Sequence, residues 1–216
     1  NELDLLNVWK DEIPAEVFTE TFTPPITDGS GNDRKNLLKA KEILEKEGWF
    51  VENGKLVKDG KEFKFEFLIV SPSDEKIALA YQSNLKKLGI TMDVRTVDSS
   101  QYQERLLSYD FDMIKRYWGV SLSPGNEQQF YWGSEVGQKD GSRNYPGINS
   151  PAVDALIEKL ISATNREELT TAIHALDRVL LWGHYVVPLY HSNKDRIAYW
   201  DFFEYPDEIP LYGIVI

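Results

Sequence analysis

The sequence has 216 residues, of which 42% are hydrophobic and 12% aromatic, proportions typical of a globular protein. A formal net charge of −11 argues against a nucleic-acid partner, which needs a basic surface, and against docking on an anionic membrane surface. Because the sequence contains no cysteine, it excludes a disulfide framework, a thiol nucleophile and a cysteine-ligated metal site.

Residues 1–33 are predicted to be a connector segment without a sustained hydrophobic period. Five prolines and glycines divide it into turns and leave room for a short helix before Trp9: Pro14, Pro24, Pro25, Gly29 and Gly31. The sequence begins Asn-Glu-Leu-Asp, with neither an initiating methionine nor a signal peptide. We therefore expect a processed product or an excised piece of a longer chain.

A helix and a hairpin are predicted next. The helix begins at Arg34 and ends at Gly48. Its spacing predicts a buried stripe made of Leu37, Leu38, Ala40, Ile43 and Leu44. Residues 49–58 are predicted to form a hairpin that turns at Asn53-Gly54, a pair typical of tight hairpin turns.

Strands and helices are then predicted to alternate. Phe63, Phe65, Phe67 and Ile69 recur at every second position, as in a half-buried strand. The predicted order is strand 63–69, helix 72–88, strand 90–97, helix 101–109 and strand 111–117. This order implies an α/β protein with a parallel βαβαβ core and right-handed crossovers.

Two amphipathic helices and a tail are predicted to complete the chain. Ser150-Pro151 gives the first helix its cap and its opening proline. Asn165 and Glu168 have the spacing of a capping box for the second. The tail is predicted to add two late strands, at residues 186–190 and 196–200, which would pair with the first series or with a lobe absent from this chain.

The loop after the third predicted strand is the strongest candidate for a binding site. Ligands of open α/β sheets lie outside the carboxyl ends of the strands. This loop combines large aromatic faces with side-chain amides, which both donate and accept hydrogen bonds; its candidate residues are Trp118, Asn126, Gln128, Gln129 and Trp132. No base, thiol or metal-ligand cluster accompanies them in the sequence, so the loop indicates binding rather than catalysis.

Each of these residues also has a structural interpretation. The tryptophans could pack at the edge of a lobe, and the amides could be solvated or cap a helix. Arg116 would suit a ligand carboxylate, but strand alternation places Lys115 and Arg116 on opposite faces, so that one of them faces the cleft. Asp110 and Asp112 lie at the amino-terminal end of the strand, away from the expected cleft, and are interpreted as a structural turn and helix-cap pair.

Several short motifs occur in an order that resembles a known family. They are Gly48-Trp49 before a hairpin, Leu88-Gly89-Ile90, Asp110-Phe111-Asp112 before Trp118-Gly119, and Asn144-Tyr145-Pro146-Gly147-Ile148 before residues 151–157. Their order and spacing resemble the C-terminal part of the family 5 extracytoplasmic solute-binding proteins of peptide and nickel ABC uptake systems. Residues 128–134 and 181–188 look most like the subgroup that handles oligopeptides, murein peptides and microcin-type peptide antibiotics.

The resemblance implies a periplasmic-binding-protein-like (type II) lobe with a βαβαβ core, flanking helices and a returning C-terminal tail. It implies a connector at 1–33, a ligand-binding lobe at 34–185, and a tail at 186–216 that contacts a missing N-terminal lobe. It also implies a bacterial, periplasmic or extracytoplasmic protein that works with a membrane ABC permease, has no cofactor, and captures a peptide or small polar solute by lobe closure.

The resemblance adds Ser121, Asn144 and Tyr145 to the expected ligand-binding residues, beside Arg116, Trp118, Asn126, Gln128, Gln129 and Trp132. Many family members place an aspartate at the position of Ser121, where it pairs with the ligand's α-ammonium group. A serine supplies no charge-assisted bond, so either another acid takes this role or the ligand is recognised differently.

Two alternatives stay open from the sequence. The first is a hydrolase of sugars or peptides that uses carboxylates such as Asp112 and Glu127 beside the aromatic loop. The second is an interaction domain that contacts a partner through the connector and the tail.

Overall fold

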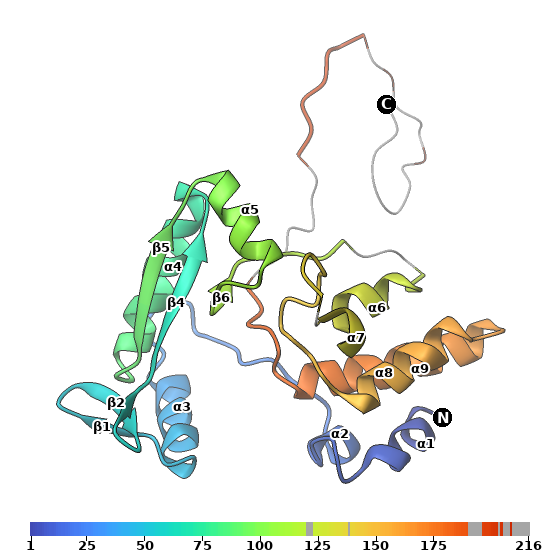
Figure 1. Ribbon diagram of the computed structural model, residues 1–216, viewed down its shortest axis with the longest axis horizontal. Coiled ribbons are helices and arrows are strands. Elements are labelled where there is room, and N and C mark those ends of the chain that lie inside the picture. The colour runs from blue at the N-terminus through green and yellow to red at the C-terminus, as the bar shows by residue number, and fades with distance from the viewer. Residues whose placement is uncertain (120–122, 138, 190–195, 203, 205–207, 209–216) are drawn as a thin grey trace. The chain divides into compact units, whose positions relative to one another are not determined.

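The computed structural model describes residues 1–119, 123–137, 139–189, 196–202, 204 and 208 (Figure 1). The chain divides into two compact units, Asn1–Tyr185 and Val186–Ile216. Within the described ranges, no helix combines the length and apolar character needed to cross a bilayer.

A parallel three-stranded sheet lies within the first unit. Its strand order is β5-β4-β6, and both neighbours run parallel to β4. The elements are β4 (Lys64–Ile69), α4 (Pro72–Lys86), β5 (Thr91–Thr96), α5 (Ser99–Leu107) and β6 (Met113–Ile114). The predicted βαβαβ order is therefore confirmed, including the parallel pairing.

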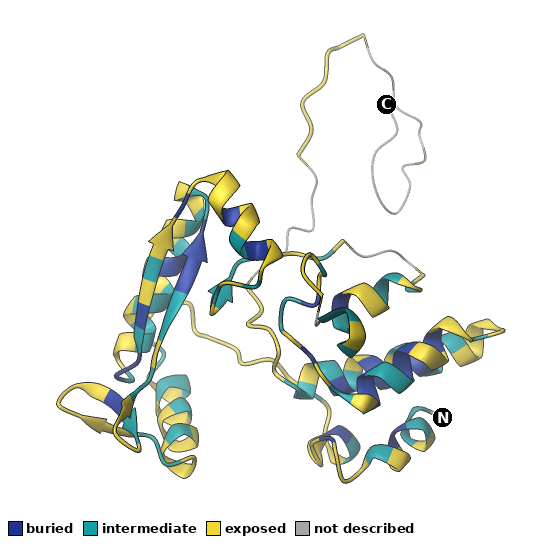
Figure 2. Ribbon diagram, viewed as in Figure 1, coloured by how far each residue is buried: buried dark blue, intermediate teal, exposed yellow. Residues whose placement is uncertain are grey.

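The central strand explains why this sheet forms here. Phe67 and Ile69 share one face of β4 and pack in a cluster with Ala78 of α4, while Leu68 faces the other way and packs with Leu106 of α5. All five side chains are buried, and Figure 2 shows the carboxyl-terminal half of β4 in the colour of buried residues. Helices cover both faces of this strand, as is usual for parallel sheets. Ligands of such sheets bind outside the carboxyl ends of the strands, so a ligand site is expected at that edge.

The third strand is much shorter than predicted. Only Met113 and Ile114 pair with β4, opposite Phe67 and Leu68. The prediction of a strand over 111–117 was wrong outside Met113–Ile114. Beyond Ile114 the side chains turn to partners outside the sheet.

A small antiparallel sheet and helix α3 (Arg34–Lys46) precede this core. Strands β1 (Phe50–Glu52), β2 (Lys55–Lys58) and β3 (Lys61–Glu62) follow one another in it. The predicted turn at Asn53-Gly54 is confirmed, and both residues adopt the positive φ that such a turn requires.

The predicted buried stripe of α3 is wrong, since Leu38 is 59% and Ile43 53% exposed and no residue of α3 is buried. No described element covers the side of the helix that carries them.

A helical cluster contains the largest hydrophobic core of the described residues. It is built from α8 (Pro151–Ile161) and α9 (Arg166–Trp182), together with α1 (Glu2–Leu6), the 3-10 turn η1 (Asn7–Trp9) and α2 (Glu16–Thr19). The predicted caps Ser150 and Asn165 both accept a hydrogen bond from the backbone of their helix.

Arg178 joins the first residues of the chain to α9. Its Nε donates to the Val17 carbonyl at 2.9 Å, and its Nη1 lies 3.2 Å from Glu2 Oε1. Leu6 and Val17 are fully buried in the same core. The first 19 residues are thus packed on α9, which the hydrophobic pattern of the sequence did not indicate.

Lys87 joins the rest of the connector to α4. Its ammonium donates to the Gly31 carbonyl at 3.1 Å, to Asn32 Oδ1 at 3.2 Å and to Asn84 Oδ1 at 3.0 Å. The end of the connector is therefore attached to the last turn of α4.

The two late strands of the tail were predicted in the second unit. Residues 186–189 and 196–200 form no strand, and residues 190–195 lie outside the described part of the chain. Strand formation needs a neighbouring chain that pairs with the backbone groups, and the described residues supply none here.

Candidate functional site

After β6, successive side chains contact different partners. Lys115 pairs with Asp74 in the first turn of α4. Arg116 and Trp118 turn to the other side, where both contact Tyr145. Tyr117, between them, is 86% exposed. The expected separation of Lys115 from Arg116 is thus seen, and Arg116 is the one that lies with the loop aromatics.

Six aromatic rings form a continuous series, which we call the aromatic row. Neighbouring ring centroids lie 5.0 to 6.4 Å apart in the order Phe111, Tyr109, Tyr145, Trp118, Trp132, Tyr131. The rings come from the turn after α5, the segment after β6, helix α6 (Glu127–Trp132) and the loop before α8. The row therefore runs from the segments on either side of β6 to the helices that follow.

Helix α6 fixes the orientation of Trp132. The indole Nε1 donates to Gln128 Oε1 one turn earlier, at 3.0 Å. Gln128 Nε2 donates in turn to Glu127 Oε1 at 3.3 Å, and the same oxygen accepts from the Gly125 amide at 2.9 Å. Burial raises the pKa of Glu127, but the hydrogen bonds from Gly125, from its own amide and from Gln128 outweigh it, so the pKa is lowered overall.

Asn144 holds the loop that carries Tyr145. Its side chain is fully buried, and its Nδ2 donates to the carbonyls of Gly133 (3.0 Å) and Ile148 (2.8 Å). Its Oδ1 accepts from the Ile148 amide at 2.9 Å. A Cβ at Gly137 would lie 2.6 Å from Nδ2, so only glycine allows this approach. Asn144 therefore positions the loop and has no exposed surface of its own.

The structure brings together four of the nine predicted site residues: Arg116, Trp118, Trp132 and Tyr145. Gln128 joins them through Trp132, whereas Asn126 and Gln129 are exposed at α6, and Asn126 makes no side-chain cap bond. Ser121 lies outside the described residues.

Three members of the aromatic row were missed by sequence reasoning: Tyr109, Phe111 and Tyr131. Tyr109 and Phe111 flank Asp110, which drew attention to the carboxylates instead. Tyr109 has a positive φ of 56°, uncommon for a side chain of this size, and its hydroxyl contacts Ser142 Oγ. Sequence alone does not reveal that conformation.

The two carboxylates of the hydrolase alternative, Asp112 and Glu127, both accept hydrogen bonds from backbone amides. Asp112 Oδ2 accepts from the Glu66 amide at 2.8 Å, which ties the turn to β4. Asp110 pairs with Arg105 at 2.8 Å, and Glu127 is engaged within α6 as described above. No group of three metal-ligating side chains occurs among the residues with a described placement.

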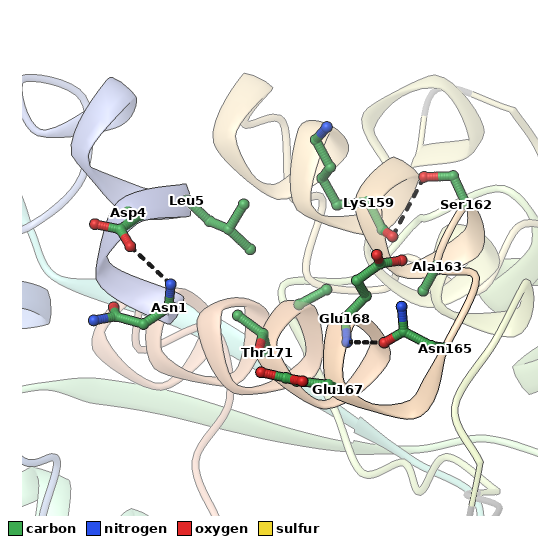
Figure 3. Close-up of a pocket in the computed structure, with 11 residues that line it drawn as sticks. Asn1, Asp4, Leu5, Lys159, Ser162, Ala163, Asn165, Glu167, Glu168 and Thr171 are labelled. Atoms are coloured by element: carbon green, nitrogen blue, oxygen red, sulfur yellow. Dashed lines mark hydrogen bonds and ion pairs between the residues drawn. The ribbon is translucent and has the colours of Figure 1, made fainter.

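A separate hollow of about 650 Å³ lies among α1, the end of α8 and the start of α9 (Figure 3). Several of its polar groups already serve helix ends. Glu168 Oε2 accepts from the Thr164 amide, Asn165 Oδ1 accepts from the Glu168 amide, and Asp4 pairs with the amino group of Asn1. No residue of the aromatic row lines this hollow, so it is not the candidate site.

Comparison with known proteins places the chain among binding proteins. The family model described as "Bacterial extracellular solute-binding proteins, family 5 Middle" matches residues 9–140. The protein y4wM of Sinorhizobium fredii is 49% identical over 99% of this chain, and the probable peptide-binding protein YejA of Agrobacterium fabrum is 42% identical over 99%. The chain spans about a third of the length of these relatives, 32% and 35% respectively.

The fold is also that of a solved binding protein. The oligopeptide-binding protein AppA from Bacillus subtilis, solved in complex with a nonapeptide, superposes with a TM-score of 0.63 at 24% identity, over 85% of this chain and 38% of AppA. The predicted periplasmic-binding-protein-like α/β fold is therefore confirmed.

Proposed function

Since the chain belongs to family 5 of the bacterial extracellular solute-binding proteins, we propose that it is the C-terminal part of the binding component of an ABC importer. Its ligand is an oligopeptide or a related small polar solute, captured by closure of two lobes. Its partners are a membrane ABC permease and the N-terminal lobe of the same protein, and its location is periplasmic or otherwise extracytoplasmic. A nonapeptide bound to AppA and the name of YejA support a peptide ligand.

The aromatic row carries this proposal. Trp118 packs on Trp132, and both Trp118 and Arg116 contact Tyr145, where the chain leaves the carboxyl end of strand β6, the expected place for a ligand. Aromatic rings that can stack, the Arg116 guanidinium and nearby side-chain amides together suit an extended polar ligand. They suit binding better than bond cleavage, because the carboxylates nearby already serve the backbone.

We assign a role to each group of site residues. Trp118 and Trp132 form a wall of the cleft, and the exposed amides of Asn126 and Gln129 contact the ligand backbone. Gln128 orients Trp132. Asn144 acts as a positioning residue, because its side chain is enclosed by the loop that presents Tyr145. Ser121 belongs to the same loop of the sequence and supplies a neutral hydroxyl.

Closure explains two exposed aromatic residues beside the wall. Tyr117 is 86% and Phe130 55% exposed, and each is next to a residue of the proposed site. Exposed aromatic residues of this kind become buried when a second lobe closes over a ligand. In the same proposal residues 34–185 form the ligand-binding lobe, residues 186–216 return to the N-terminal lobe, and residues 1–33 connect the two.

The proposal is tested in the full-length parent protein. A thermal-shift screen with di- to hexapeptides, murein peptides, oligosaccharides and nickel chelates identifies the ligand class, because a ligand at 100 times its Kd stabilises the fold by about 2.7 kcal/mol. Trp118→Ala combined with Gln129→Ala is expected to abolish the shift. Trp49→Ala is the matched control, since Trp49 is equally half-buried and its ring packs on Phe63 at 4.8 Å. A thermal shift with sugars alone would show that the ligand is a sugar and not a peptide. A double variant that binds normally would exclude Trp118 and Gln129 from the ligand site.

A further inference from the structure

Helix α3 carries a charge opposite to that of the rest of the chain. Its 13 residues include five Lys or Arg and two Glu, a formal charge of +3, so the net charge of −11 leaves −14 for all other residues. Every other helix of the described residues is neutral or acidic. The net charge argues against an anionic membrane partner only where charge is spread evenly, and α3 departs from that condition.

Three lysines of α3 form what we call the lysine line: Lys35, Lys39 and Lys46. At 3.6 residues per turn, they lie within about 40° of one another around the helix axis. The opposite side of the helix is the half-buried one, and it carries Leu37, Ala40 and Leu44. The lysine line therefore faces solvent, and Figure 2 shows both exposed and half-buried residues along α3.

The lysine line has no carboxylate partner in the described part of the chain. The one ion pair described within α3 joins Lys41 to Glu45 at 3.6 Å. Glu42 lies beside the line, but no Asp or Glu oxygen of the described residues comes within 4.0 Å of the three ammonium groups. These cations are therefore available to a partner outside the chain.

The first turn of α3 also favours a partner over a role in folding. Arg34 and Lys35 are its first two residues, at the positive end of the helix dipole, where cations are unfavourable. Helices α4, α8 and α9 instead have acidic residues in their first turns. Residues that break a local rule of stability are expected at functional surfaces.

Two exposed apolar side chains flank the lysine line. Leu38, 59% exposed, lies on one side of it around the helix, and Ile43, 53% exposed, lies on the other. Lysines beside exposed apolar side chains are typical of helices that lie at a membrane interface, where the ammonium groups contact lipid phosphates and the apolar groups reach the acyl boundary. An acidic protein surface would satisfy the lysines alone, whereas a lipid surface receives both kinds of side chain.

We propose that α3 is a docking surface for anionic phospholipid headgroups, with the lysine line on the phosphates and Leu38 and Ile43 at the acyl boundary. The inference rests on the proposed function for the location beside a membrane, but it concerns a surface outside the ligand site. At 0.1 M salt, charges are largely screened beyond about 10 Å, so the helix that touches the bilayer counts for more than acidic residues farther away. Such a contact keeps the binding protein near its permease.

The test is sedimentation of the full-length protein with lipid vesicles. One set of vesicles contains about 40% phosphatidylglycerol in phosphatidylcholine, and the other contains phosphatidylcholine alone. Wild-type protein is expected to bind the anionic vesicles about ten-fold or more tightly at 0.1 M salt. At about 0.5 M salt most of this preference should be lost, because the lysines are screened.

Variants assign the binding to α3. Each cation near an anionic bilayer contributes about five-fold, so replacing all three residues of the lysine line by Gln should weaken binding about ten-fold or more. Leu38→Ser combined with Ile43→Ser should weaken it about five-fold or more. The matched control makes the same change in net charge at three exposed lysines elsewhere and should bind within about two-fold of wild type; it combines Lys10→Gln, Lys76→Gln and Lys159→Gln.

Three outcomes would overturn the inference. They are equal binding to the two kinds of vesicle, equal losses in the lysine-line and control variants, and binding only to neutral nanodiscs that contain the permease, which would assign α3 to an acidic protein surface. Unchanged binding after Leu38→Ser with Ile43→Ser would overturn the contact of these side chains with the acyl boundary. Thermal unfolding of each variant shows that the fold is preserved.

The ligand-induced thermal shift keeps this inference apart from the proposed function. A normal shift in a protein that binds no vesicles would overturn the docking surface and leave solute binding intact. Vesicle binding through α3 without a shift from any ligand would count against the proposed function and support the docking surface.

Discussion

Trp118 and Trp132 lie with their ring centroids 5.0 Å apart and their planes tilted by 37°. Each indole N–H is already used inside the fold, since Trp118 Nε1 donates to the Arg143 carbonyl at 3.3 Å and Trp132 Nε1 donates to Gln128 Oε1. What the pair offers a ligand is therefore ring surface and not a hydrogen-bond donor.

This distinction predicts the behaviour of two substitutions at Trp118. Trp118→Phe keeps an aromatic face and loses a single exposed hydrogen bond, so ligand affinity should stay within about three-fold of wild type. Trp118→Leu removes the aromatic face and should weaken binding about ten-fold or more. Isothermal titration of the full-length protein with the ligand class from the thermal-shift screen measures both. An equally large loss in the two variants would show that the N–H group matters after all.

Much of the parallel core could be predicted because its signal is local. Alternating apolar residues from Phe63 to Ile69 mark a strand, and Gly89 marks the end of the helix that follows. The length of the third strand could not be predicted in this way, because pairing depends on what the side chains beyond Ile114 contact. Arg116 and Trp118 find Tyr145, which is distant in sequence.

The candidate site was predicted less completely for a similar reason. Trp118 and Trp132 are conspicuous in the sequence, whereas the burial of Asn144 depends on three backbone groups that only the folded loop presents. The predicted stripe of α3 had the right period, but periodicity states which face is apolar and not what covers it. Leu38 and Ile43 therefore fit the predicted period and are nevertheless exposed.

Asn144→Ala is predicted to destabilise the fold by about 3 kcal/mol. The substitution leaves the carbonyls of Gly133 and Ile148 and the amide of Ile148 without their partner, and buried unpaired groups cost about 1–3 kcal/mol each, offset by local relaxation. Urea unfolding followed by tryptophan fluorescence measures the change. Asn149→Ala, at an exposed position of the same loop, should change the free energy of unfolding by less than about 0.5 kcal/mol. Similar effects of the two substitutions would contradict the positioning role.

Arg178→Met is predicted to release the first 19 residues from α9 without unfolding the rest of the chain. Methionine keeps an apolar stem against the core but loses the bonds to the Val17 carbonyl and to Glu2, which together are worth about 1–3 kcal/mol. Hydrogen exchange should become faster in α1 and α2 and remain unchanged in β4 and β5. Arg166→Met, in the exposed first turn of the same helix, serves as the control and should leave the exchange of α1 and α2 as in wild type.

The contribution of Glu127 to the stability of the fold is predicted to depend on pH. Its pKa is lowered from the ordinary value of 4.5, because the hydrogen bonds it accepts from Gly125, from its own amide and from Gln128 outweigh the effect of burial. A carboxyl group whose pKa is lower in the folded state stabilises that state above its unfolded pKa. The contribution is lost as the pH falls from about 4.5 through the lowered folded value.

Glu127→Gln should therefore reduce stability at neutral pH and have a shrinking effect as the pH falls below about 4.5, as measured by urea unfolding at several pH values. Glu135→Gln is the useful comparison, because the pKa of Glu135 is lowered by its exposed pairing with Lys139. Salt at about 0.5 M should remove most of the effect of Glu135→Gln by screening and leave that of Glu127→Gln, which arises from hydrogen bonds. A Glu127→Gln effect that is constant with pH would show that the carboxylate charge does not stabilise the turn into α6.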